Sequence, residues 1–127
     1  MMQGKKGLIM GVANDRSIAW GISKKLASEG AELAFTYQGD SLKKRVLPLA
    51  ESIGSSILIP CDVTNSESMK NTFEILNQKW NKIDFLVHAI GFSNKDELRG
   101  KYYNTSSENF NQTMHISCYS FTEACRL

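Results

Sequence analysis

The sequence predicts an α/β protein in which helices cover both faces of a parallel sheet. Four short apolar segments of strand length alternate along the chain with stretches of helical periodicity. Within each short segment the apolar residues are nearly continuous, as in strands buried on both faces. Alternating strands and helices with right-handed crossovers then give a doubly wound, Rossmann-type sheet of order 3-2-1-4. Its ligand crevice should lie at the carboxyl ends of strands 1 and 4.

The four strands are expected at segments that combine strand length with apolar composition. They are GLIMGV at 7–12, LAFTY at 33–37, SILIP at 56–60 and DFLVHAI at 84–90.

Two helices are expected between the first three strands. The first has an apolar residue every four positions and stops at a glycine: Ile18, Ile22, Leu26 and Gly30. The second has similar spacing: Leu42, Val46, Leu49 and Ile53, ending at Gly54. Pro48 lies inside this second pattern, and we expect it to break or kink the helix at Leu47.

Two further helices are expected to begin at capping boxes. Thr64 with Glu67 precedes a stripe formed by Met69, Phe73, Leu76 and Trp80. Thr105 with Glu108 opens the last helix, whose stripe is Phe110, Met114, Ser117, Phe121 and Ala124. If the sheet ends at the fourth strand, we expect one unpaired edge and exposed side chains at Met114 and Phe121.

Composition sets the class of protein. The chain has 127 residues, 42% hydrophobic and 22% charged, with a net charge of +2, which fits one ordinary globular domain. No basic stripe interleaves with aromatic residues, so we expect no nucleic-acid partner. Three cysteines without C-x-x-C spacing indicate reduced thiols and no metal site. No stretch resembles a signal peptide or a membrane span, so the expected location is cytoplasmic.

The segment GVANDRSIAWG, which follows the first strand, is a candidate turn for binding a pyrophosphate. Gly11 supplies conformational freedom, and Ser17 and Ile18 stand at the start of a helix, where amides lack partners within the helix. Asn14 and Asp15 can tie the longer loop down by Asx-type bonds in place of further glycines. From the residues alone, a plain N-cap serine after a loop explains Ser17 equally well.

The ends of the second and third strands offer candidates for the adenosine end of a dinucleotide. Gln38 stands where such sites commonly carry an acidic residue for the ribose, while Asp40 is expected to start the next helix. Asp62 can accept a hydrogen bond from the adenine amino group, with Val63 packed on the ring. Alternatively, Asp62 is a loop aspartate near the Thr64 cap.

Several segments together resemble the bacterial enoyl-acyl-carrier-protein reductases of the divergent short-chain dehydrogenase/reductase type. They are GVANDRSIAWGI, GAELAFTYQGD, KKRV, CDVT, DFLVHAIGF, KDELRGKY and HISCYSF. The resemblance extends from about Gly4 to Leu127, and the turn G-V-A-x-x-x-S-I-A is this group's replacement for the usual glycine-rich turn. Residues 1–127 are then expected to be the N-terminal part of a single Rossmann-fold domain, cut before the later strands.

The resemblance implies roles for individual residues. Gly11, Ser17 and Ile18 would contact the pyrophosphate region, Gln38 would lie beside the adenosine ribose, and Asp62 and Val63 would frame adenine. Ile90 and Gly91 would border the nicotinamide and the acyl pocket, and Ser93 would touch the acyl substrate through its main chain. His88 matches a strand residue of the family and is expected to be structural.

The same resemblance implies an activity, a cofactor and partners. Members transfer hydride from NADH to the trans-2,3 double bond of an enoyl thioester carried on acyl carrier protein. A homotetramer in the cytoplasm is implied as well, with the last helix in the main subunit contact.

The resemblance places no catalytic residue within residues 1–127. The tyrosine that donates to the enolate, and the lysine seven positions later, would fall after Leu127, so this chain alone is expected to be inactive. Tyr37 and Lys44 have the right spacing only by chance, because they lie at the adenosine end. Two alternatives are a non-catalytic nucleotide-binding half domain and a related carbonyl reductase; Gln38 and the HAIGF segment argue against the latter.

Overall fold

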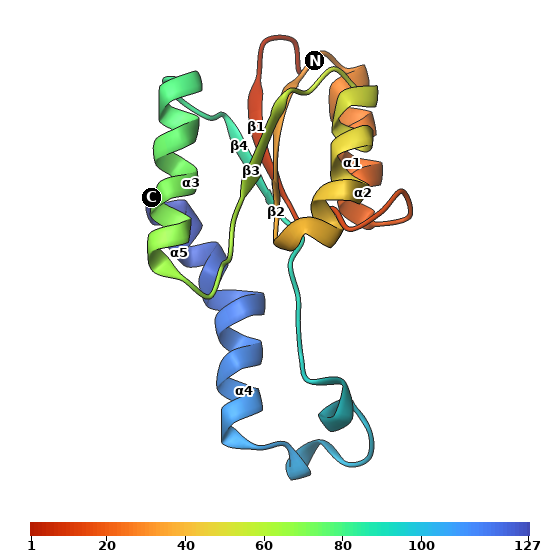
Figure 1. The fold of residues 1–127 in the computed structure, drawn as a ribbon, viewed down its shortest axis with the longest axis vertical. Coiled ribbons are helices and arrows are strands. Elements are labelled where there is room, and N and C mark those ends of the chain that lie inside the picture. The colour runs from red at the N-terminus through yellow and green to blue at the C-terminus, as the bar shows by residue number, and fades with distance from the viewer. The chain divides into compact units, whose positions relative to one another are not determined.

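The computed structural model describes residues 1–127 and divides them into two compact units. The N-terminal unit is Met1–Ala89 and the C-terminal unit is Ile90–Leu127. In Figure 1 the N-terminal unit runs from red to teal, and the C-terminal unit continues from teal to blue.

The N-terminal unit is built on a four-stranded parallel sheet of order β3-β2-β1-β4, as predicted. Its strands are β1 (Lys6–Met10), β2 (Glu32–Tyr37), β3 (Ile57–Pro60) and β4 (Phe85–His88). Ile9 of β1 pairs with Phe35 of β2 on one side and with Val87 of β4 on the other. The order confirms the doubly wound topology that the alternation of strands and helices predicts.

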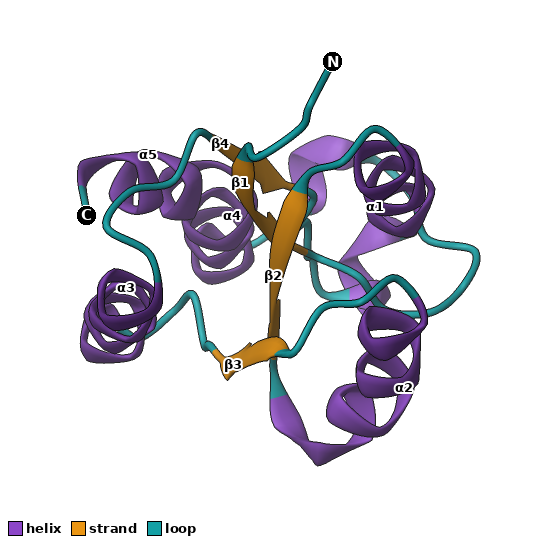
Figure 2. Ribbon diagram, turned by 90° about the horizontal axis from the view of Figure 1, so that it is seen from above, coloured by secondary structure: helices purple, strands orange, loops and turns teal.

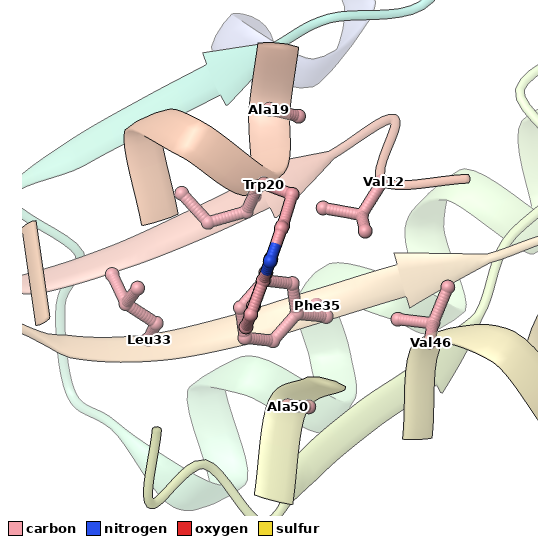
Figure 3. Close-up of a cluster of buried hydrophobic side chains, with 8 residues drawn as sticks. Val12, Ala19, Trp20, Leu33, Phe35, Val46 and Ala50 are labelled. Atoms are coloured by element: carbon pink, nitrogen blue, oxygen red, sulfur yellow. The ribbon is translucent and has the colours of Figure 1, made fainter. Parts of the chain in front are cut away.

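Three helices pack on this sheet: α1 (Ile18–Ser28), α2 (Gly39–Ser52) and α3 (Ser66–Lys79). Figure 2 shows α1 and α2 together on one face of the sheet and α3 on the other. Figure 3 shows the core under α1 and α2, in which Trp20 of α1 and Phe35 of β2 belong to one buried cluster. The buried members of this cluster are Ile9, Val12, Ala19, Trp20, Leu33, Phe35, Val46 and Ala50.

The fourth strand is less buried than its apolar sequence predicts. All four residues of β4 are half-buried, whereas β1 and β2 are buried along most of their length. The difference arises because β4 is an edge strand that pairs only with β1. The expected unpaired edge is therefore present at β4.

The second helix continues through Pro48, so the expected break at Leu47 is wrong. The α-helix runs without interruption from Gly39 to Ser52 with the proline inside it. Both Leu47 and Pro48 lie on the exposed side of α2. The carbonyl of Lys44, which the proline leaves without its helical partner, can bond to water on that side.

Both predicted capping boxes are wrong by one residue. The N-cap of α3 is Asn65, whose side chain accepts from the amides of Glu67 and Ser68. The Thr64 hydroxyl instead donates to Asp62 Oδ1 over 2.7 Å. Since Asn65 can satisfy two amides with one oxygen, it displaces the threonine as the cap.

The C-terminal unit begins with an extended segment and ends in a long helical rod. Short 3₁₀ turns at Lys95–Leu98 and Tyr102–Asn104 lead to α4 (Ser107–Met114), a π-helical turn (His115–Tyr119) and α5 (Ser120–Arg126). The extra residue of the π turn interrupts the single helix expected here. Met114 and Phe121 are exposed, as expected.

The cap of α4 is Ser106, and the acidic partner of that cap comes from outside the helix. The Ser106 hydroxyl accepts from Asn109 N over 3.1 Å. Glu97 accepts from both the amide and the hydroxyl of Ser106, at 2.6 and 2.9 Å. Glu97 therefore takes the place predicted for Glu108.

Two further features concern the whole chain. Its helices are all too short or too polar to cross a membrane. Cys61 is buried, Cys118 and Cys125 are exposed, and none of the three forms a disulfide.

Candidate functional site: a dinucleotide-binding edge

The carboxyl ends of β1, β2 and β3 bring three predicted residues to one edge of the N-terminal unit. Gly11 follows β1, Gln38 follows β2 and Asp62 lies two residues after β3. The ladders continue past the strand ends, with Cys61 N bonded to Tyr37 O and Ala89 N bonded to Met10 O, both at 2.8 Å. In a doubly wound sheet this edge is where ligands bind.

Gly11 is required by the fold itself as well as by any ligand. Its φ is +108°, in the region that favours glycine. A Cβ at this position would collide with the carbonyl oxygen of Ala89, the residue after β4. Only glycine lets the chain leave β1 so close to its neighbour.

Side chains tie down the loop after Gly11, as predicted for Asn14, but the second residue is Ser17 and not the predicted Asp15. Asn14 Oδ1 accepts from Arg16 N over 2.8 Å, which forms an Asx turn. The Ser17 hydroxyl donates to Asn14 O over 2.6 Å and accepts from Ala13 N over 3.3 Å. Because that hydroxyl has a single proton, donating it to a phosphate would require release of the Asn14 carbonyl.

The start of α1 has the properties of an anion site. Ser17 is the N-cap but its side chain caps no amide, and no acidic residue lies in the first turn. The amides of Ile18 and Ala19 form no hydrogen bond, whereas the Trp20 amide is bonded to Ser17 O over 3.0 Å. The helix dipole adds positive potential at these two amides. The Ile18 side chain is 80% exposed. An anionic ligand would therefore find backbone donors at this point.

Gln38 and its neighbours form a neutral-to-basic corner. Gln38 is the N-cap residue of α2, and its exposed side chain makes no capping bond. Asp40 lies in the first turn of α2, as predicted. The Lys43 ammonium lies 5.9 Å from the centre of the Tyr37 ring, which keeps one positive charge near the end of β2.

Asp62 has a structural role that the sequence also allowed. Its Oδ1 accepts from Thr64 N and Oγ1 at 2.9 and 2.7 Å, and its amide donates to Ser68 Oγ. No hydrogen bond in the structure uses Oδ2, so one carboxylate oxygen remains able to accept from a ligand. Val63 is buried.

Ile90, Gly91 and Ser93 belong to the C-terminal unit. They continue the chain beyond β4 in an extended segment. Ser93 Oγ accepts from Asn109 Nδ2 and Thr113 Oγ1 at 3.1 and 3.0 Å. Phe92 is held by Ser117. Sequence reasoning missed Asn109 and Thr113 because side-chain contacts across 16 to 20 residues leave no local pattern.

His88 lies within β4, where it pairs with Met10. Burial lowers the pKa of its imidazole below the ordinary value, so the neutral form predominates at neutral pH. Both observations fit the structural role expected for it.

The fold and this edge define a class: a Rossmann-type nucleotide-binding protein whose phosphate turn is shaped by side chains in place of repeated glycines. A model of the enoyl-(acyl carrier protein) reductase family matches residues 11–127. The chain belongs to this family.

Similar proteins agree with that assignment. The chain is 57% identical to the NADH enoyl-acyl-carrier-protein reductase 2 of Rhizobium meliloti and 52% identical to the NADH reductase FabI of Rickettsia prowazekii. Each match covers 99% of this chain, but only 47% and 48% of the relatives. The chain thus spans about half the length of these curated relatives.

Solved structures show the same coverage. FabI of Candidatus Liberibacter asiaticus superposes with a TM-score of 0.97 at 58% identity. The reductase of Anaplasma phagocytophilum, solved with NAD, gives 0.95 at 54% identity. Each covers 98% of this chain and 48% of the solved one.

Proposed function

We propose that residues 1–127 are the cofactor-binding half of an NADH-dependent enoyl-acyl-carrier-protein reductase of fatty acid synthesis. The observation that carries the proposal is the start of α1 beside Gly11, which can bind an anion. The chain also matches this family over residues 11–127. The proposal is further supported by Gln38 at the same sheet edge, a side chain that can donate to and accept from ribose hydroxyls.

The residues of this edge fit NADH as follows. Gly11 and the first amides of α1 would receive the pyrophosphate, with Ser17 and Ile18 at the contact. Gln38 would bond to the adenosine ribose. The adenine ring would lie by Val63, with Asp62 Oδ2 as an acceptor for the amino group.

When bound, NADH supplies hydride to the β carbon of the enoyl thioester. Ile90 and Gly91 would border the nicotinamide, and Ser93 would meet the acyl group through its main chain. The negative charge that develops on the thioester oxygen needs a preorganised donor. In the family a tyrosine provides it, assisted by a lysine, and both would lie beyond Leu127.

The proposal extends to the setting of the enzyme. The substrate would be an enoyl thioester on acyl carrier protein, in the cytoplasm, and the working form would be a homotetramer. Both units would be parts of a single Rossmann-fold domain in the whole protein.

Initial rates on the full-length protein test the function. We expect NADH oxidation with a trans-2-enoyl thioester on acyl carrier protein, faster with NADH than with NADPH, because Gln38 attracts no 2′-phosphate. NADPH is the alternative cofactor to test, since a similar reductase from Bacillus cereus was solved with NADP⁺. A clear NADPH preference would show that Lys43 and its basic neighbours dominate.

Residues 1–127 by themselves provide the matched comparison. Without the tyrosine donor we expect a rate lower by roughly 10² to 10³, and lower still without the lysine. Comparable rates from both proteins would direct the search to Tyr102, Tyr103 and Tyr119. NADH binding without turnover by the full-length protein would favour a non-catalytic nucleotide-binding protein.

A further inference from the structure

The extended segment at Gly91–Asn94 is held along one side by the helical rod of the same unit. The Ser117 hydroxyl accepts from Phe92 N over 3.0 Å and donates to Phe92 O over 3.2 Å. One hydroxyl therefore bonds both main-chain polar groups of Phe92. Asn109 Oδ1 accepts from Asn94 N over 2.8 Å. Phe92 and Asn94 are therefore both tied to the rod.

Because the two bonded residues, Phe92 and Asn94, flank Ser93, they determine which way its main chain faces. In an extended chain, successive residues present their main-chain groups to opposite sides. With Phe92 and Asn94 bonded to the rod, the main chain of Ser93 faces away from it. No hydrogen bond in the structure uses the Ser93 amide or carbonyl, while the Ser93 hydroxyl is bonded to Asn109 and Thr113.

Asn109 is the centre of this arrangement. Its side chain is 7% exposed, and its amide group donates to Thr105 Oγ1 as well as to Ser93 Oγ. Its own backbone amide is bonded to the Ser106 cap, which Glu97 holds in turn. The orientation of Asn109 is thus fixed on every side, and a fixed amide can define the position of the segment that it binds.

We propose that Asn109 and Ser117 are positioning residues that hold the main chain of Ser93 in register for the acyl thioester. The inference rests on the proposed function, because it gives the free side of Ser93 to the acyl substrate. The two residues contact neither substrate nor cofactor; they act through the Phe92 and Asn94 main chain.

The test uses the full-length protein and four variants. Asn109→Ala and Ser117→Ala remove the two tethers, Ser117→Thr retains a hydroxyl, and Ser107→Ala is the control. Ser107 is an exposed serine at the start of the same α4 and has no bond to the extended segment. For each variant we would measure kcat and KM for the enoyl thioester, and Kd for NADH by titration.

We expect KM for the thioester to rise about tenfold in each alanine variant, the value of one or two lost hydrogen bonds. NADH affinity should change much less than the thioester KM, because the adenosine and pyrophosphate contacts lie in the N-terminal unit and only Gly91 of the tethered segment would border the nicotinamide. Ser117→Thr should restore KM toward wild type, and Ser107→Ala should match it.

Two results would overturn the inference. One is an unchanged thioester KM in both alanine variants. The other is a parallel loss of NADH affinity, kcat and melting temperature, which would give the network a merely structural role. Failure of the wild-type protein to reduce any enoyl thioester would instead contradict the proposed function, so the two failures are distinguishable.

Discussion

Gly11 meets two demands with one missing side chain. Its positive φ turns the chain out of β1, and its lack of a Cβ leaves room for the Ala89 carbonyl. A substitution here acts on the sheet before it acts on any pyrophosphate. Loss of NADH binding in a Gly11 variant would therefore be ambiguous unless folding is measured too.

We predict that Gly11→Ala lowers the melting temperature of the full-length protein and weakens NADH binding with it. Strain at a positive φ costs on the order of 1 kcal/mol, and the collision with Ala89 adds to it. Gly21→Ala is the control: it lies inside α1 with open space around it, and should gain about 0.5–1 kcal/mol. An unchanged melting temperature in Gly11→Ala would contradict the steric argument.

Ser17 provides a second test at the same turn. Ser17→Ala removes the hydroxyl bonds to Asn14 O and Ala13 N that shape the loop, and with them the proton that the hydroxyl could turn to a phosphate on release of Asn14 O. We expect NADH affinity to fall about tenfold by calorimetric titration. Ser28→Ala, at the other end of α1, should bind NADH normally, since its hydroxyl bonds only to Lys25 O. Equal NADH affinities for the two variants would show that Ser17 is not part of the cofactor site.

The Asp84 carboxylate leads to a prediction about how the stability of the fold changes at acidic pH. Its Oδ2 accepts from Lys6 N over 2.9 Å, and this bond, together with Lys5 and Lys82 nearby, lowers the pKa of the carboxyl below its ordinary value. A lowered pKa stabilises the fold above the ordinary pKa, and this stability is lost as pH falls through the folded-state value. Melting curves below pH 4 should thus drop less steeply for Asp84→Asn than for the wild type.

At the scale of elements, the N-terminus of α3 is where the structure differs from the sequence prediction: Asn65 is the cap, and not Thr64. Asn65→Ala should cost about 1 kcal/mol, because Asn65 caps two amides. Glu67, the acidic half of the predicted box, forms an exposed ion pair with Lys70, so Glu67→Ala should cost only a few tenths of a kcal/mol. The melting temperatures of the two variants compare these costs directly. A larger loss of stability in Glu67→Ala would support the predicted Thr64–Glu67 capping box.

Element order and type were predictable from the sequence because they depend on apolar periodicity. The order β3-β2-β1-β4 follows from strand–helix alternation and the handedness of crossovers. The missed details depend on choices between neighbours: Thr64 or Asn65 as cap, and a broken or a continuous α2 at Pro48. Such choices are decided by exposure and side-chain geometry, which a periodic pattern does not contain.

The candidate site divides in the same way. Gly11, Ser17, Gln38 and Asp62 could be found because each follows a predicted strand or begins a predicted helix. The Asn109 and Ser117 tethers could not, because a polar residue on a helix gives no sequence signal for the distant main-chain group that it bonds. The π turn that includes Ser117 also shifts the helical register there, which no apolar repeat indicated.

For the whole molecule, assembly is the property to measure. The helical rod formed by α4, the π turn and α5 exposes Phe110, Met114 and Phe121, each close to half of its surface. Apolar surface of this kind favours association. We predict a tetramer for the full-length protein by analytical sedimentation at micromolar concentration. A monomer would refute the assembly while leaving the cofactor site intact.

The side-chain bonds of the Ala13–Ser17 loop have a consequence for protein engineering. A loop with a single glycine at Gly11 has fewer backbone conformations in the unfolded chain than a glycine-rich one, so ordering it costs less entropy. Its shape is also set by separate hydrogen bonds from Asn14 and Ser17, which can be changed one at a time. Libraries that aim to alter cofactor choice should therefore vary Asn14–Ser17 and Gln38 while leaving Gly11 constant.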